Sequence, residues 1–268
     1  MKNPHNTYTH LTSELKKYFA KAGYRKAVLG LSGGIDSALT LKLAIDALGE
    51  DAVTALIMPE NGVTKDENNI HAKRLAQFLH VKHHSIPINK YLMDLLQLPW
   101  KPSELAQMNT KARARTIILY NYANTERALV LGTSNKSELL LGYGTKYGDL
   151  AADVMPIADL YKTEVFELAE HISLPDEIIK KPPTAELYKD QTDEDELGAP
   201  YSEIDPLLKK LDTSSEDALN QSLQTLQGNT AELAKEFPSL TLSTIGSLLD
   251  RVKKNRHKGA LPYIIPTN

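Results

Sequence analysis

Residues 28–40 constrain the fold more than any other part of the chain, because they read Val-Leu-Gly-Leu-Ser-Gly-Gly-Ile-Asp-Ser-Ala-Leu-Thr. The apolar run from Ala27 to Leu31 predicts a buried strand, and a helical apolar pattern begins at Asp36-Ser37. Two adjacent glycines between them let the backbone turn sharply and bring N–H groups close to a ligand. The free N–H groups and positive dipole end of the helix then favour a bound phosphate. Asp36 stands where a carboxylate can hold the Mg²⁺ that accompanies a polyphosphate.

This glycine-rich loop differs from two common nucleotide-binding motifs. It lacks Gly-x-x-x-x-Gly-Lys-[Ser/Thr], and the order Gly30-Leu31-Ser32-Gly33-Gly34 is not Gly-x-Gly-x-x-Gly. The pattern Ser-Gly-Gly-x-Asp-Ser over residues 32–37 resembles the pyrophosphate loop of the ATP pyrophosphatase superfamily, whose members cleave ATP between the α and β phosphates to adenylate a substrate. The alternative is a glycine-rich turn between a strand and a helix with no ligand.

Composition excludes several classes of function. The 268-residue chain contains no cysteine, which removes disulfides, cysteine-ligated zinc, iron–sulfur clusters and a cysteine nucleophile. A net charge of −3 gives no basic excess for gripping a polynucleotide, so we expect a small-molecule substrate and no nucleic-acid partner. The N-terminus lacks the apolar segment of a signal peptide, and no apolar run approaches the length of a membrane span. We therefore expect a cytoplasmic protein.

The order of strand and helix patterns predicts an α/β fold with a doubly wound parallel sheet, of the Rossmann-like kind, because strands alternate with helices of 10–15 residues. The expected strands are residues 26–31, 52–58, 82–86 and 127–132, and the expected helices before residue 125 are 10–22, 37–48, 66–80, 88–97 and 103–124. Helices then dominate, at 161–173, 202–211, 215–227, 230–236 and 241–256. We expect a single domain over residues 1–268, with an α/β body at about 23–160 and a helical C-terminal part at about 161–258.

A second polar cluster, Gly132-Thr133-Ser134-Asn135-Lys136-Ser137-Glu138, follows the fourth expected strand. Ligands of such sheets bind beyond the carboxyl ends of the strands, so this cluster and the glycine-rich loop share one edge. Hydroxyls and a carboxylate suit a polyphosphate with Mg²⁺ opposite Asp36. The residues alone favour a simpler interpretation, in which Glu138 belongs to a capping box at the start of a short helix.

Taken together, several segments closely resemble NAD⁺ synthetase of the ammonia-dependent type, in family order over about residues 26–258. They are Ser32 to Ser37, Asn109 to Arg115, Thr133 to Glu138, Thr145-Lys146-Tyr147-Gly148-Asp149, Lys180 to Ala185, Asp193 to Gly198 and Arg256-His257-Lys258. The phosphate loop is shared across the superfamily, whereas the later segments are specific to this family.

The resemblance implies roles for individual residues. ATP would contact Gly30, Leu31, Ser32, Gly33, Gly34, Ile35, Asp36, Ser37, Thr133, Lys162 and Thr184. Mg²⁺ would be held by Asp36 and Glu138. The dinucleotide deamido-NAD⁺ would contact Asn109, Arg113, Arg115, Lys146, Asp153, His257 and Lys258. The catalytic residues would be Asp36, Glu138, Lys162 and Asp153. Family members are homodimers, with the dinucleotide site near the interface.

Simpler interpretations remain open for several of these residues. Arg113 and Arg115 fit a solvated helix face, and the basic residues 253–258 fit a solvated helix end. Residues 142–148 fit either a flexible surface loop or a lid over the active site. We interpret the charges of Asp193 to Glu196 as a solvated run, within a loop that can close over the substrate.

Two further sequence features limit the expected site. The histidines at positions 80, 83 and 84 lack a carboxylate at ligand spacing, so we expect no zinc there. Some family members carry an arginine before the proline that follows the second strand, whereas this chain has Ile57-Met58-Pro59, and we assign no adenine contact there.

The resemblance implies an ATP-dependent amidation of deamido-NAD⁺ through an adenylated intermediate, giving NAD⁺, AMP and pyrophosphate. Glutamine-using relatives carry a glutaminase domain with a cysteine nucleophile, and this chain has no cysteine, so we expect it to take free ammonia or to receive ammonia from another polypeptide. The alternatives are a tRNA-modifying enzyme, a GMP-synthetase ATPase subunit, or an adenine-nucleotide sensor without turnover.

Overall fold

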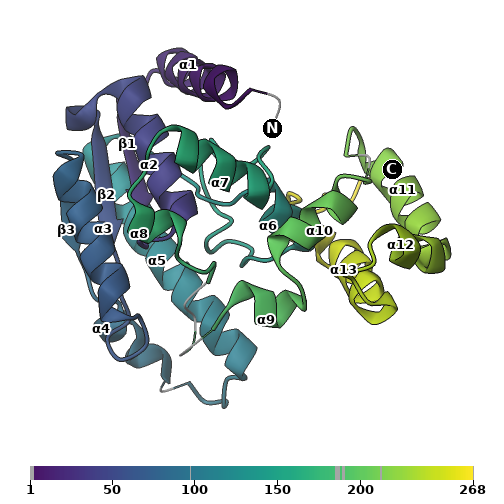
Figure 1. Ribbon diagram of the computed structural model, residues 1–268. Helices are drawn as coiled ribbons and strands as arrows, with labels where there is room; N and C mark the ends of the chain where they lie inside the picture. The colour runs from purple at the N-terminus through teal and green to yellow at the C-terminus, as the bar shows by residue number, and fades with distance from the viewer. Residues whose placement is uncertain (1–2, 97, 185–187, 189–190, 212, 268) are drawn as a thin grey trace.

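The centre of the molecule is a sheet of four parallel strands. We describe a computed structural model of the chain, covering residues 3–96, 98–184, 188, 191–211 and 213–267. The strands are β1 (Lys26–Gly30), β2 (Val53–Ile57), β3 (Lys82–Ser85) and β4 (Ala128–Leu131). Their order across the sheet is β3-β2-β1-β4, and every neighbouring pair is parallel (Figure 1). This confirms the predicted α/β fold with a parallel sheet.

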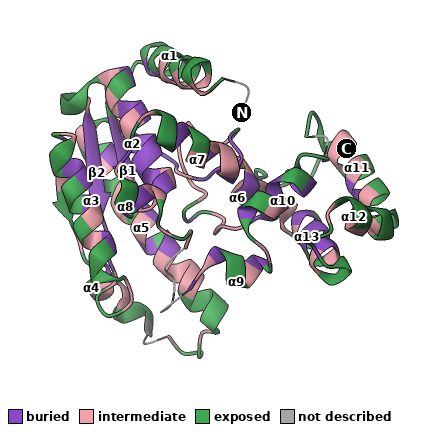
Figure 2. Ribbon diagram, viewed as in Figure 1, coloured by how far each residue is buried: buried purple, intermediate pink, exposed green. Residues whose placement is uncertain are grey.

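Helices cover both faces of this sheet, which is the doubly wound arrangement. Side chains alternate along a strand, so Ala27 and Leu29 pack on one face and Val28 on the other. All three are buried, and β1 and β2 are coloured mostly as buried in Figure 2, whereas the edge strand β3 is largely exposed. A sheet covered on both sides requires the continuous apolar strands that the sequence contains.

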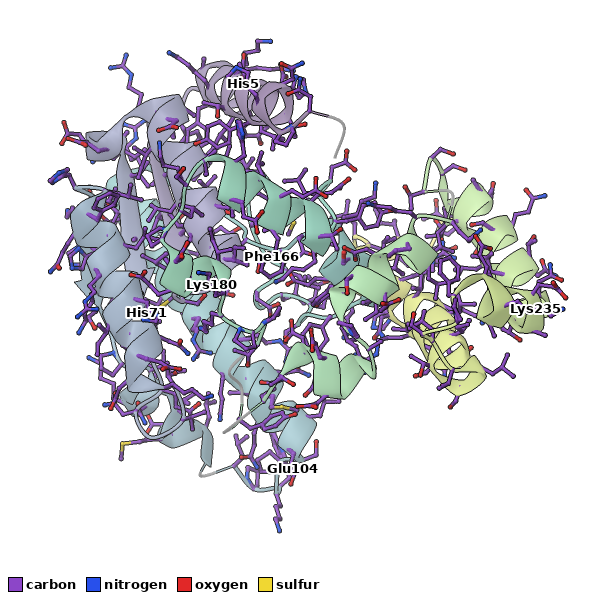
Figure 3. All side chains as sticks on the ribbon, in the orientation of Figure 1. His5, His71, Glu104, Phe166, Lys180 and Lys235 are labelled. Atoms are coloured by element: carbon purple, nitrogen blue, oxygen red, sulfur yellow. The ribbon has the colours of Figure 1, made fainter. Side chains whose placement is uncertain are left out.

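The first face is covered mainly by α1 (Pro4–Ala22), α2 (Ile35–Leu48), α3 (Asp66–Phe78) and α7 (Lys162–His171), with the short α8 (Asp176–Ile179) beside α2 and α7. The second face is covered by α5 (Glu104–Glu126), with α4 (Asn89–Leu92) packed against it. In Figure 3, His5 on α1 and Glu104 at the start of α5 lie at opposite ends of the molecule. Short 3₁₀ turns occur at η1 (Glu50–Ala52) and η2 (Asp94–Leu96).

The C-terminal helices form a second hydrophobic core beside the sheet (Figure 1). They are α9 (Asp193–Leu197), α10 (Tyr201–Leu208), α11 (Glu216–Gly228), α12 (Thr230–Glu236), α13 (Leu242–Asn255) and the 3₁₀ turn η3 (Arg256–Lys258). Apolar residues recur on one face of α13, where Ile245, Leu248, Leu249 and Val252 are buried. This matches the predicted helical C-terminal part.

A buried polar joint connects the two parts. The carboxylate of Asp205 on α10 accepts a hydrogen bond from Ser137 Oγ at 2.5 Å and from the backbone N–H of Thr163 at 2.8 Å. Ser137 belongs to α6 (Lys136–Leu141), and its Oγ also accepts a bond from the N–H of Lys162 at 2.9 Å. Asp205 is fully buried, so its charge depends on these donors.

The structure differs from the sequence expectations mainly at element ends. The first helix begins at Pro4 rather than at residue 10, because Asn3 caps it and proline suits the first helical position. The expected helix 88–97 is broken into α4 and η2 within the described residues, and Asn89 bonds instead to the backbone of Asn61. Among the helices that the structure describes, none is long and apolar enough to cross a membrane.

Gly142 supplies a test of how α6 and α13 fit together. It ends α6 with a φ of 60°, and a Cβ at this position would overlap the side chain of Asn255 on α13. We expect Gly142→Ala to lower the free energy of unfolding by about 2–4 kcal/mol, from left-handed strain and overpacking.

Gly246→Ala is the matched control within α13, where a Cβ meets nothing within 4 Å. It should stabilise the protein by about 0.5–1 kcal/mol in the same urea titration. Equal effects of both variants would contradict this packing.

Candidate active site

A cavity of about 490 Å³ lies at the carboxyl ends of β1, β2 and β4. Its lining includes the glycine-rich loop after β1, Met58 and Pro59 after β2, and Gly132-Thr133-Ser134 after β4. The first turns of α5 contribute Leu105 and Met108, so one part of the cavity is apolar. The predicted edge of the sheet is therefore where the structure forms its cavity.

The glycine-rich loop is held in shape by serine hydroxyls. Ser37 Oγ accepts the N–H of Ser32 at 3.2 Å and donates to the carbonyl of Gly34 at 3.0 Å, while Ser32 Oγ accepts the N–H of Gly34 at 3.2 Å. Gly33 has a φ of 81°, and a Cβ there would lie 2.5 Å from the carbonyl oxygen of Asn68. Gly34 caps α2 without a side-chain hydrogen bond, which leaves backbone N–H groups for an anion.

The chemical centre of the cavity is an ion triad formed by Asp36, Glu138 and Lys162. Lys162 Nζ lies 2.5 Å from Asp36 Oδ2 and 3.4 Å from Glu138 Oε1, and its side chain is only 3% exposed. Asn135 Nδ2 donates to the other oxygen of Asp36 at 2.9 Å. These residues come from the starts of α2, α6 and α7, so three helices meet at this point.

Glu138 forms the capping box that the residues alone favour, and its carboxylate also faces the cavity. Its Oε2 accepts the N–H of Asn135 at 3.2 Å, and Asn135 Oδ1 accepts the N–H of Glu138 at 3.0 Å, which completes a capping box. Its other oxygen faces Lys162. The capping box therefore orients the carboxylate that Glu138 contributes to the ion triad.

Burial and neighbouring charges shift the pKa values of this triad. Burial, together with the charge of Asp36, raises the pKa of Glu138 to about 8. Burial lowers the pKa of Lys162, but the charges of Asp36 and Glu138 outweigh it and leave the pKa above its ordinary value. Lys162 is therefore charged at neutral pH and is the cation that lies between the two acidic side chains of the ligand-free site.

The donor set of Asp36 and Glu138 fits a magnesium ion. Mg²⁺ is commonly held by one or two carboxylates together with substrate phosphates, and both carboxylates here face the space beside the phosphate loop. Within the described residues there is no group of three or more His, Cys, Asp and Glu that could hold a metal without such a substrate.

Cations predicted to bind the dinucleotide lie together at a second part of the site. Lys146 Nζ donates to the carbonyls of His257 at 2.6 Å and Ala260 at 2.8 Å. Arg113 Nε and Nη2 donate to the carbonyl of Lys146, and Lys258 Nζ donates to that of Gly142 at 2.8 Å. The structure thus places residues 142–146 against the C-terminal turn of the same chain, and the His257 side chain is exposed.

Other predicted residues fall into two groups. Asn109, Arg115, Thr133 and Thr184 line the cavity, and Arg115 Nε donates to the carbonyl of Met58 at 3.0 Å. Asp153 lies outside the cavity lining and is exposed. Its carboxylate accepts the N–H of Val130 at 2.8 Å and the hydroxyl of Tyr120 at 3.3 Å.

The interpretation of Asp193 to Glu196 as a solvated run is wrong for its first residue. Asp193 is 2% exposed and lines the cavity, because it begins α9 and faces Tyr201 on α10. Burial raises the pKa of its carboxyl. A local signal for the helix was present, since Thr192 caps α9 through the N–H of Asp195 and Gly198 ends it.

A sequence model of the NAD synthase family matches residues 7–262. The chain belongs to this family. A relative named NH(3)-dependent NAD(+) synthetase, from Methanocaldococcus jannaschii, is 41% identical over 256 residues, which are 94% of this chain and 93% of that protein. The family membership agrees with the resemblance inferred from the sequence.

Solved structures share the fold over nearly the whole chain. An NH3-dependent NAD synthetase from Campylobacter jejuni, in complex with the nitrate ion, matches with a TM-score of 0.77 and 33% identity, covering 98% of this chain and 99% of that one. An NMN synthetase from Francisella tularensis matches with a TM-score of 0.79 and 30% identity, covering 99% of each chain.

The raised pKa of Glu138 predicts a pH-dependent stability of the ligand-free protein. A carboxyl whose pKa is higher in the folded state favours folding at low pH, and this contribution is lost as the pH rises from 4.5 to about 8. Glu138→Gln cannot ionise, so it should be more stable than the wild type at pH 9 by about 1–3 kcal/mol, and the difference should vanish near pH 5. Thermal unfolding at both pH values measures this.

The control is Glu164→Gln, at the capping-box position of α7. It should follow the pH dependence of the wild type. Identical pH profiles for Glu138→Gln and the wild type would contradict the electrostatic description of the triad.

Proposed function

We propose that this chain is an ammonia-dependent NAD⁺ synthetase, which converts deamido-NAD⁺, ATP and ammonia into NAD⁺, AMP and pyrophosphate. The observation that carries the proposal is the triad of Asp36, Glu138 and Lys162 directly beside the phosphate loop, in a chain matched by the NAD synthase family over residues 7–262. ATP-dependent adenylation needs a phosphate-binding loop, a cation for the leaving pyrophosphate and paired carboxylates for magnesium.

ATP phosphates are assigned to residues 30–37, with Thr133, Lys162 and Thr184 as further contacts. Asp36 and Glu138 are the proposed ligands of Mg²⁺, which when bound would neutralise charge developing on the phosphates. Lys162 is already charged and buried, so it can stabilise phosphate oxygens without being desolvated during the reaction.

The chemistry proceeds in two displacements. An oxygen of the nicotinate carboxylate attacks the α-phosphorus of ATP, and the bond to the bridging oxygen breaks as pyrophosphate leaves with its electron pair. The nitrogen lone pair of ammonia then attacks the adenylated carboxyl carbon. The C–O bond to AMP breaks, AMP leaves with that electron pair, and the nitrogen releases one proton to solvent. Adenylation is needed because an unmodified carboxylate oxygen is a poor leaving group.

For the dinucleotide we propose Asn109, Arg113, Arg115, Lys146, Asp153, His257 and Lys258. Cationic side chains suit the pyrophosphate and carboxylate of deamido-NAD⁺. Asp153 is exposed outside the cavity lining, so its contact requires the dinucleotide to extend beyond the cavity. A homodimer would place a second chain near this exposed part of the site.

We further propose that residues 1–268 act as one domain in the cytoplasm. The joint of Ser137, Lys162 and Asp205 supports the single domain, because it links the sheet layers to the C-terminal helices through buried hydrogen bonds. If the C-terminal helices moved away from the sheet layers, the carboxylate of Asp205 would lose the hydrogen bonds from Ser137 and Thr163.

An alternative is amidation of a mononucleotide. It is supported by the match to the Francisella tularensis NMN synthetase, which covers 99% of this chain, against 98% for the NAD synthetase structure. The two reactions share the nicotinate carboxylate, ATP and ammonia, and differ in whether the substrate carries an adenylate half. Turnover of the two nucleotides distinguishes the two reactions.

Assays with purified protein test the proposed function. We expect AMP and NAD⁺ in equal amounts from deamido-NAD⁺, ATP and ammonium, with a higher kcat/KM than for nicotinate mononucleotide. The rate should rise with pH through neutrality because NH₃ is the nucleophile.

Asp36→Ala should lower kcat by roughly 10³-fold, about 4 kcal/mol, without unfolding the chain. A preference for the mononucleotide would identify an NMN synthetase, and turnover with glutamine in ammonia-free buffer would contradict the nitrogen source.

Lys146 provides a test of the dinucleotide site. We expect Lys146→Ala to raise KM for deamido-NAD⁺ by roughly 10-fold or more, because a charge-assisted hydrogen bond contributes about 1.5–3 kcal/mol. KM for ATP should change less than about twofold. Lys253→Ala, an exposed lysine near the end of α13, is the control and should leave both values unchanged. A parallel rise of both KM values in Lys146→Ala would place this lysine elsewhere in the mechanism.

A further inference from the structure

Asp193 has a buried carboxylate oxygen that the reaction described above does not use. Its Oδ1 is buried and has no hydrogen-bond partner among the described residues. The other oxygen, Oδ2, accepts the hydroxyl of Tyr201 at 3.2 Å. A buried carboxylate oxygen without a donor is costly, so this position calls for a ligand that donates a hydrogen bond.

The position of Asp193 is fixed by the surrounding backbone and rings. Its N–H donates to the carbonyl of Pro183 at 3.0 Å, which holds the start of α9 against the chain beside Thr184. The hydroxyl of Tyr143 also faces its carboxylate. Asp193 thus lines the cavity from the start of α9, as do Glu138 and Lys162 from their own helices.

Asp193 lies close to the ion triad. Its charge acts on both Glu138 and Lys162, and Lys162 Nζ lies 5.4 Å from the centre of the Tyr201 ring that contacts Asp193. Three carboxylates thus share one lysine at this end of the cavity. Such a site attracts a small cation or a neutral hydrogen-bond donor.

We propose that Asp193 binds the ammonia, with Oδ1 accepting one of its N–H groups. This inference rests on the proposed function. Of the substrates of that reaction, ammonia is the one that carries N–H donors and no negative charge. A hydrogen bond from N–H to Oδ1 leaves the nitrogen lone pair free for the adenylated carboxyl. The same oxygen attracts ammonium from solution, which loses one proton to solvent to give the ammonia that attacks, so Asp193 raises the local concentration of the nitrogen donor.

If Asp193 binds ammonia, its substitution should impair the second half-reaction, amidation, and spare the first, adenylation. Adenylation needs ATP and the dinucleotide but not ammonia, so it can be measured alone as ATP–pyrophosphate exchange. We expect Asp193→Asn, which keeps shape and removes charge, to raise KM for ammonium by roughly 10- to 100-fold. Exchange without ammonia should stay within about twofold of the wild type, and KM for ATP and for the dinucleotide should be unchanged.

The control is Glu194→Gln, an exposed residue next in the same helix, which should match the wild type in every measurement. Thermal unfolding checks that each variant is folded. If Asp193→Asn does not fold, Asp193→Glu keeps the charge but moves the oxygens, and the same rise of KM for ammonium is expected.

Three results for Asp193→Asn would overturn the proposal. The first is an unchanged KM for ammonium. The second is a parallel loss of ATP–pyrophosphate exchange, which would place Asp193 in adenylation or metal binding. The third is a raised KM for ATP or the dinucleotide, which would indicate a ribose contact. A wild-type protein that shows no exchange with any nicotinate nucleotide would instead contradict the proposed function.

Discussion

The contact of Lys162 with Asp36 and Glu138 is the interaction on which the arrangement of the site depends. It joins the first turns of α2, α6 and α7, and it therefore links the helices that follow β1 and β4 to α7. Taking one ammonium and two carboxylates out of water is expensive, and apolar residues of the same volume often stabilise a protein more. The triad is thus better explained by what it positions than by the stability it provides.

Much of the fold could be predicted from the sequence because local and global requirements agree. Continuous apolar strands, a Gly-Gly turn and helices of regular spacing all favour one parallel sheet, and the register Ala27 to Val53 and Ala128 to Lys26 places both polar clusters at one edge. Helix ends were less accurate, since capping by Asn3 and the Asn61–Asn89 contact depend on side-chain geometry that periodicity does not contain.

The site was only partly predictable, for a physical reason. Asp36 and Glu138 follow adjacent strands, so topology alone brings them together. Lys146 and the carbonyl of His257 lie 111 residues apart, and only the family resemblance joined them before the structure did. Asp193 was misjudged because a run of four acidic residues is usually solvated, whereas packing against Tyr201 selects one of the four for burial.

The side chains of Arg113 and Lys146 donate their hydrogen bonds to backbone carbonyls and not to carboxylates. A carbonyl is a dipole with no net charge, so the electric field of each cation is not cancelled locally and extends into the solvent. An anion that approaches these side chains therefore meets an attractive potential and displaces no competing anion. Under the proposed function, the backbone carbonyls are the partners of these cations only until the dinucleotide binds, and water can then satisfy the carbonyls.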